Sequence, residues 1–110
     1  MMRIDAMWLC SAPQDMRMGG ERLLAKAVEV FGAAQAHHAY LFANARATRM
    51  KLVMHDGFGL WCAVRRLNTG RLSWPSAQAA TWQLSRQQFE ALMVGLPWQR
   101  LESMRAITHL

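Results

Sequence analysis

The chain has 110 residues, a length that supports one hydrophobic core and excludes a multi-domain organisation. With 53% hydrophobic and 18% charged residues it is not a disordered tail, and its apolar runs fall short of the roughly 20 residues that span a bilayer. The formal net charge of +6 favours a polyanionic or acidic partner. We therefore expect one basic domain over residues 1–110.

The N-terminal third predicts a strand, a loop and a helix. Apolar side chains recur with a period of two over Arg3–Cys10, as in a strand. The following loop contains Asp15 and Arg17, which are expected to form either a local ion pair or part of a recognition loop. Residues 20–31 have the stripe of an amphipathic helix, and Gly32 is well placed to end it. No secretory signal pattern is present at the start, so we expect a cytoplasmic protein.

Residues 39–75 predict the strand core. Met50, Leu52 and Met54 alternate with basic and smaller residues, as expected for a half-buried strand. The Asp-Gly-Phe-Gly sequence at residues 56–59 is typical of a tight hairpin. Residues 60–67 are too apolar to alternate, so this strand is expected to be central or covered on both faces. Residues 71–74 are expected to form a short final strand that Pro75 ends.

The C-terminal third predicts a linker and a second helix. Residues 76–83 give no decided pattern. Ser85 and Gln88 have the spacing of a capping box, which places a helix at about residues 86–95, and Trp98 is expected to fold back as an apolar lid. Together these segments predict an α+β fold, in which a small antiparallel meander of about four to five strands packs with two helices.

Signals for catalysis and for metal binding are missing from the sequence. The seven acidic residues show no close catalytic spacing, and no phosphate loop or dinucleotide fingerprint is present. The adjacent His37 and His38 point to opposite faces of an extended chain, and Cys10 and Cys62 are expected to remain reduced thiols. We expect no enzymatic activity, no metal and no cofactor.

The positive charge is concentrated in Leu41–Pro75. This stretch carries +5 of the net charge of +6, since Asp56 is its only acidic residue. Its cations, together with Arg17, are the candidate residues for binding nucleic acid or a protein partner: Arg46, Arg49, Lys51, Arg65, Arg66 and Arg71. A solvated basic face without a ligand explains the same residues equally well. Because strand alternation separates Arg65 from Arg66, we expect the binding surface to be a subset centred on Arg49 and Lys51.

Three blocks of the sequence resemble the TnpB accessory proteins of the IS66 family of insertion sequences. They are DMRMGGERL (Asp15–Leu23), LFANARATRMKLVMHDGFGLWCAVRRLNTGRLSWP (Leu41–Pro75) and LSRQQFEALMVGLPW (Leu84–Trp98). The resemblance implies a role in transposition beside a separate, larger transposase that carries the catalytic carboxylates. It implies neither nuclease activity nor any other defined biochemical activity.

The resemblance and the positive charge together lead to one main hypothesis for the function and one alternative hypothesis. The main expectation is a non-enzymatic accessory protein that contacts DNA, the transposase of the same element, or both, through the basic sheet surface. The rival is a protein–protein adaptor or homodimeric subunit that makes no contact with nucleic acid. A homo-oligomer is possible under either, and no membrane partner is expected.

Overall fold

The structure is a computed structural model that describes residues 3–76, 79–99 and 101. Five strands and two helices follow one another along the chain. In order they are β1 (Ala6–Cys10), α1 (Gly20–Phe31), β2 (His38–Ala43), β3 (Arg49–His55), β4 (Leu60–Arg66), β5 (Thr81–Leu84) and α2 (Arg86–Met93). The predicted α+β class is confirmed.

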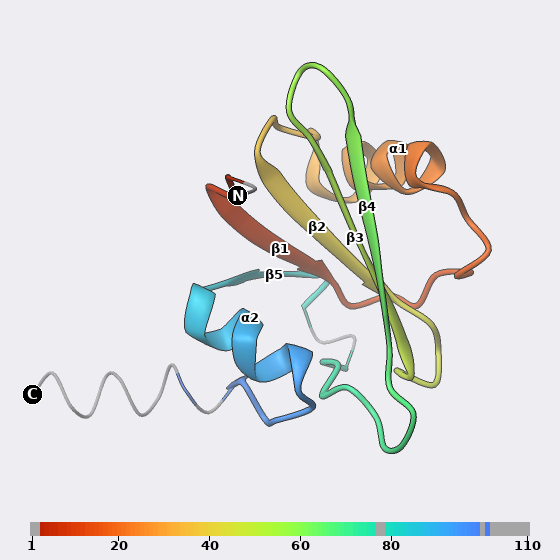
Figure 1. Cartoon of the computed structure of the whole chain (residues 1–110), viewed down its shortest axis with the longest axis vertical. Coiled ribbons are helices and arrows are strands. Elements are labelled where there is room, and N and C mark those ends of the chain that lie inside the picture. The colour runs from red at the N-terminus through yellow and green to blue at the C-terminus, as the bar shows by residue number, and fades with distance from the viewer. Residues whose placement is uncertain (1–2, 77–78, 100, 102–110) are drawn as a thin grey trace, which may run out of the picture.

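The strands form one open, mixed sheet in the order β4-β3-β2-β1-β5 (Figure 1). The pairs β2–β3, β3–β4 and β1–β5 are antiparallel, whereas β1 and β2 are parallel. The predicted antiparallel meander is therefore wrong at one pair. Helix α1 makes the crossover between β1 and β2, and such a connection returns the chain in the same direction.

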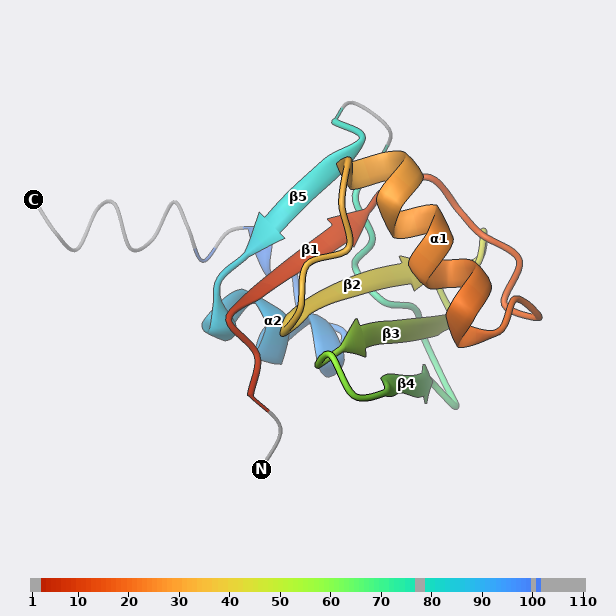
Figure 2. The same cartoon turned by 90° about the horizontal axis from the view of Figure 1, so that it is seen from above.

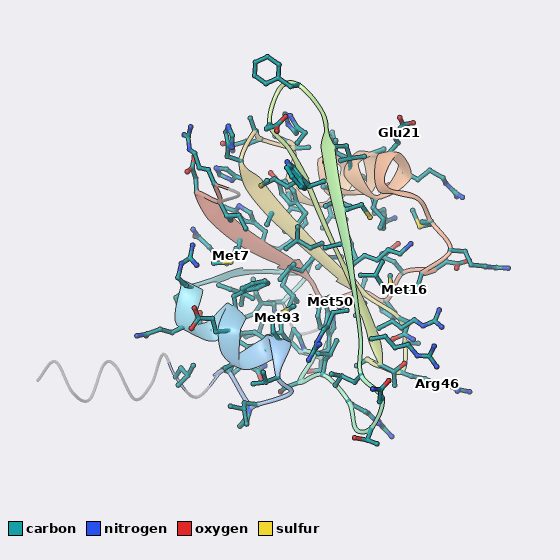
Figure 3. The ribbon with its side chains drawn as sticks, in the orientation of Figure 1. Met7, Met16, Glu21, Arg46, Met50 and Met93 are labelled. Carbon is teal, nitrogen blue, oxygen red and sulfur yellow. The ribbon has the colours of Figure 1, made fainter. Side chains whose placement is uncertain are left out.

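The two helices cover opposite faces of the sheet, as the view from above shows (Figure 2). Met50, Leu52 and Met54 of β3 point to the α2 face, where the buried Trp98 completes the core. Val53, between them, points to the α1 face and belongs to a second buried cluster. The predicted alternation along β3 is thus confirmed, and Figure 3 shows Met50 and Met93 close together on the α2 side.

The local signals that end and begin the helices are also confirmed. Gly32 follows α1 in the left-handed conformation, with φ of 85°, which glycine adopts without steric cost. Ser85 accepts a hydrogen bond from the Gln88 backbone N–H, and the Gln88 side chain accepts one in return from the Ser85 N–H. Trp98 is more than a lid, because it is fully buried and donates a hydrogen bond from Nε1 to the Ser73 carbonyl.

Two predictions about the strands are wrong, and a segment without a decided sequence pattern contains a strand. The apolar strand β4 lies at the edge of the sheet, and all seven of its residues are exposed. Residues 71–74 form no strand, since the Leu72 N–H bonds to the Ala47 carbonyl instead of to a neighbouring strand. The undecided segment 76–83 contains most of β5, which pairs with β1.

Among the described residues, no helix is long and apolar enough to cross a membrane.

Candidate nucleic-acid interface

Four of the seven predicted cations line one hollow at the end of the sheet where β4 finishes. Arg17 comes from the loop between β1 and α1, Arg46 from the turn between β2 and β3, Arg49 from β3 and Arg66 from β4. The hollow has a volume of about 570 Å³, and its only acidic lining residue is Asp15. We call Arg17, Arg46, Arg49 and Arg66 the arginine cluster. Figure 3 shows Arg46 projecting from the turn at this end of the sheet.

The turn that carries Arg46 is held in place by Asn44. The Asn44 side-chain oxygen accepts hydrogen bonds from the backbone N–H groups of Thr48 (2.9 Å) and Arg49 (3.1 Å). Its amide nitrogen donates to the Thr48 hydroxyl at 3.0 Å. Ala47, within this turn, has a positive φ of 55° that the surrounding bonds enforce. An asparagine whose side chain bonds to nearby backbone N–H groups in this way is a known turn signal.

Arg49 and Arg66 are directly opposite each other on β3 and β4. Their Cβ atoms are therefore about 5 Å apart, on the face of the sheet that α1 covers. Like charges at such a position destabilise a sheet. Neither arginine takes part in an ion pair with any residue that the structure describes. An anion between the two guanidinium groups would relieve this repulsion.

Arg17 reaches the hollow from a loop and is already paired with Asp15. Its Nε and terminal nitrogen donate to the two Asp15 carboxylate oxygens at 3.1 and 2.8 Å. These bonds, with the Arg17 backbone N–H, lower the pKa of Asp15 to about 2. The predicted ion pair is confirmed, and the same geometry places Arg17 beside the other arginines.

Lys51 has a different position from the one expected at the centre of the surface. It is half-buried under the loop that precedes α1, and its Nζ donates to the Met18 carbonyl at 2.9 Å. Lys51 therefore ties this loop to β3 rather than pointing into the arginine cluster. Because Arg17 lies in the same loop, Lys51 helps to hold Arg17 against the hollow.

The remaining two candidate residues lie outside the cluster. Arg65 is on the α2 face and donates from Nε to the Met93 carbonyl at 3.2 Å. Arg71 lines a neighbouring hollow of about 340 Å³, which it shares with Arg46. The predicted separation of Arg65 from Arg66 onto opposite faces is confirmed.

No aromatic residue that the structure describes lines the hollow of the arginine cluster. Phe58 is fully exposed at the tip of the β3–β4 hairpin, at the opposite end of β3 from Arg46. Trp74 packs against the core and donates from Nε1 to the Cys10 carbonyl at 3.0 Å. The arrangement favours contact with phosphate groups over base stacking.

Two residues of a type that performs acid–base chemistry, Asp56 and His55, have structural partners. Asp56 accepts hydrogen bonds from the N–H groups of Phe58 and Gly59, which lower its pKa and stabilise the hairpin turn. His55 Nε2 is 2.6 Å from the Ala34 carbonyl. Within the described residues, no group of three or more histidine, cysteine and acidic side chains is placed to hold a metal ion.

Comparison with known proteins gives one family. The model of a family described as "IS66 Orf2 like protein" matches residues 5–103. A relative in Sinorhizobium fredii (strain NBRC 101917 / NGR234), the uncharacterized protein y4hO, is 28% identical over 93 residues, covering 84% of this chain and 81% of the relative. No solved structure matches.

Proposed function

Because the chain belongs to the IS66 Orf2-like family of transposition-associated proteins, we propose that it is a non-enzymatic accessory protein that binds the phosphate backbone of DNA through the arginine cluster. The observation that carries this proposal is the convergence of four arginines on one hollow against a single carboxylate. Guanidinium groups bind phosphate oxygens in a bidentate manner, and such contacts fix a protein on a duplex without reading its sequence.

The test is a binding titration of labelled duplex DNA, followed by fluorescence anisotropy at several salt concentrations. Each phosphate contact contributes about −0.9 to the slope of log affinity against log salt. The double variant Arg49→Ala/Arg66→Ala should therefore bind more weakly and lower the magnitude of the slope by about 1.8. Arg86→Ala, which removes an exposed arginine of α2 outside the hollow, is the matched control and should behave as the wild type.

One outcome would contradict the proposed surface. If the folded double variant kept the affinity and salt slope of the wild type, the arginine cluster would not be the contact site. Far-UV circular dichroism establishes that the variant is folded, so loss of structure cannot be mistaken for loss of binding.

A second candidate function is an adaptor that docks directly on the transposase. The observation in its favour is the exposed apolar side chains of β4, among which Trp61 is 51% and Val64 61% exposed. A pull-down of the transposase, with and without nuclease treatment, distinguishes the two functions. Recovery that survives nuclease and high salt supports direct docking, whereas recovery that is lost with nuclease supports bridging by DNA.

A further inference from the structure

Strand β4 carries an open hydrogen-bonding edge with an apolar surface. Within the described part of the chain only β3 pairs with it. Leu60, Trp61 and Val64 are 38%, 51% and 61% exposed, respectively. An edge strand in a monomer is normally shielded by charge, proline or a bulge, and the segment from Leu60 to Val64 has none of these devices.

The outward-facing groups of β4 follow from its pairing with β3. The Asp56 N–H bonds to the Gly59 carbonyl, and the Leu67 N–H bonds to the Thr48 carbonyl. Hydrogen-bonded pairs alternate along an antiparallel ladder, so the residues of β4 that bond to β3 are Trp61, Ala63 and Arg65. The intervening residues present their N–H and C=O groups outward, and these residues are Leu60, Cys62, Val64 and Arg66.

We propose that β4 pairs with β4 of a second copy of this chain, antiparallel and about a two-fold axis at Ala63. In this register Leu60 lies opposite the second copy's Arg66, and Cys62 lies opposite its Val64. Every outward-facing residue of β4 then gains a hydrogen-bonded partner. Ala63 meets its own copy at the axis, where its small side chain allows close approach. The two sheets become one continuous ten-stranded sheet.

Charge complementarity selects this antiparallel self-pairing. Arg65 and Trp61 lie on the same face, and the register sets Arg65 of each copy over Trp61 of the other, a favourable cation–aromatic pair. The Trp61 Nε1 lies 3.3 Å from the Asp56 carboxylate, which adds a negative charge at the same place. A parallel pairing would instead set the arginines of the two copies side by side, and like charges so placed are destabilising.

The other face of the strand offers a second complementary contact. Leu60 lines an apolar groove of about 630 Å³ together with Glu21 of α1. Arg66 of the second copy lies opposite Leu60 on this face, so it faces a groove with a carboxylate at its wall. In this register Arg65 thus lies near Asp56 of the other copy, and Arg66 lies near its Glu21.

Cysteine cross-linking tests the register, because a disulfide requires Cα atoms within about 7 Å of each other. At the axis the two Cα atoms of residue 63 are about 4.5 Å apart. The variant Cys62→Ser/Ala63→Cys should therefore form a covalent dimer of about 25 kDa, twice the chain mass of 12.5 kDa, under mild oxidation. In the wild type, the Cα atoms of the two Cys62 residues are about 8 Å apart, so it should remain uncross-linked. The matched variant Cys62→Ser/Val64→Cys should behave in the same way.

Sedimentation equilibrium of the full chain provides a second measurement that needs no engineered cysteine. The wild type should show a dimer, and Val64→Lys should shift the mass to that of the monomer because it places a charge in the apolar edge. Leu96→Lys, at a side chain that is 54% exposed and outside β4, is the control and should leave the dimer intact.

Two results would overturn the proposal. One is a monomeric wild type together with no cross-link at residue 63. The other is protection of the β4 amides from hydrogen exchange only after transposase is added, which would make the transposase the occupant of this edge. DNA binding by folded, monomeric Val64→Lys distinguishes failure of the dimer from failure of the arginine cluster.

Discussion

The two faces of the sheet differ in how completely they are covered by packed side chains. Over β1, β2 and β3 the α2 face is closed by Trp98, Leu92 and the methionines of β3, all buried. The α1 face is closed only in its middle, by Leu23 and Ala27 against Val53, and at one end it leaves the arginine cluster around an open hollow. Residues on the first face should therefore determine stability, whereas those at the open end of the second should determine binding at some expense of stability.

Removing the largest side chain of the α2 face should have the largest effect. Trp98→Ala deletes a fully buried indole, its hydrogen bond to Ser73 and its edge contact with Trp82. We expect the free energy of unfolding to fall by about 3–5 kcal/mol, measured by urea denaturation. Phe58→Ala, at a fully exposed aromatic, should change it by less than about 0.5 kcal/mol. Similar values for the two variants would refute the described packing.

Removing the capping box of α2, the helix that covers the same face, should have a smaller effect on stability. Ser85→Ala removes the hydroxyl that accepts the Gln88 N–H at 3.1 Å, so α2 should lose about 1 kcal/mol of stability. The DNA affinity of the folded fraction should not change. Ser76→Ala, at an exposed serine outside the helix, is the control and should leave the urea midpoint unchanged.

At the open end of the α1 face, in contrast, a substitution should raise the free energy of unfolding. Arg49→Gln removes the repulsion from Arg66, so the free energy of unfolding should rise by roughly a few tenths of a kcal/mol. DNA affinity should fall in the same variant, because one phosphate contact is lost. Arg86→Gln should change neither quantity. A fall in stability at Arg49→Gln would show that the arginine pair is not strained and would weaken the contrast between the faces.

The smallest predicted effect concerns the titration of Asp15. Its pKa of about 2 lies below the ordinary value of 3.8, mainly because of the hydrogen bonds from the Arg17 side chain. The pair therefore stabilises the loop fully above pH 3.8, and this contribution is lost as the pH falls through about 2. Carboxyl-carbon NMR should record the low midpoint in the wild type and a midpoint shifted upward toward 3.8 in Arg17→Ala, where only the backbone N–H bond remains. An unchanged midpoint in that variant would rule out the pair in solution.

The features that the sequence predicted well are those set by neighbours in the chain. The period of two in β3, the glycine after α1 and the Ser85–Gln88 capping box depend on residues a few positions apart. The same holds for the separation of Arg65 from Arg66, which follows from strand geometry alone.

The features that cannot be predicted from the sequence depend on contacts across the fold. An apolar run cannot show whether a strand is covered or lies at an edge, so the sequence wrongly predicts an interior position for β4. The arginine cluster joins Arg17 to Arg46 through tertiary structure, which no spacing in the sequence reveals. Lys51 lies on the same face of β3 as Arg49, but its Nζ bonds to the Met18 carbonyl, and this long-range contact cannot be predicted from the sequence.

The position of β1 between β2 and β5 affects how the chain folds while it is being synthesised. β2, β3 and β4 are joined by short turns, so their contacts can form as soon as that stretch leaves the ribosome. The pairing of β1 with β5, in contrast, can form only after Leu84, the partner of Met7, has been synthesised. Until then the newly made chain exposes an unsatisfied strand edge in its apolar centre, where premature association is a hazard. Pulse-labelled nascent chains that end before β5 should therefore require chaperones more than the completed protein does.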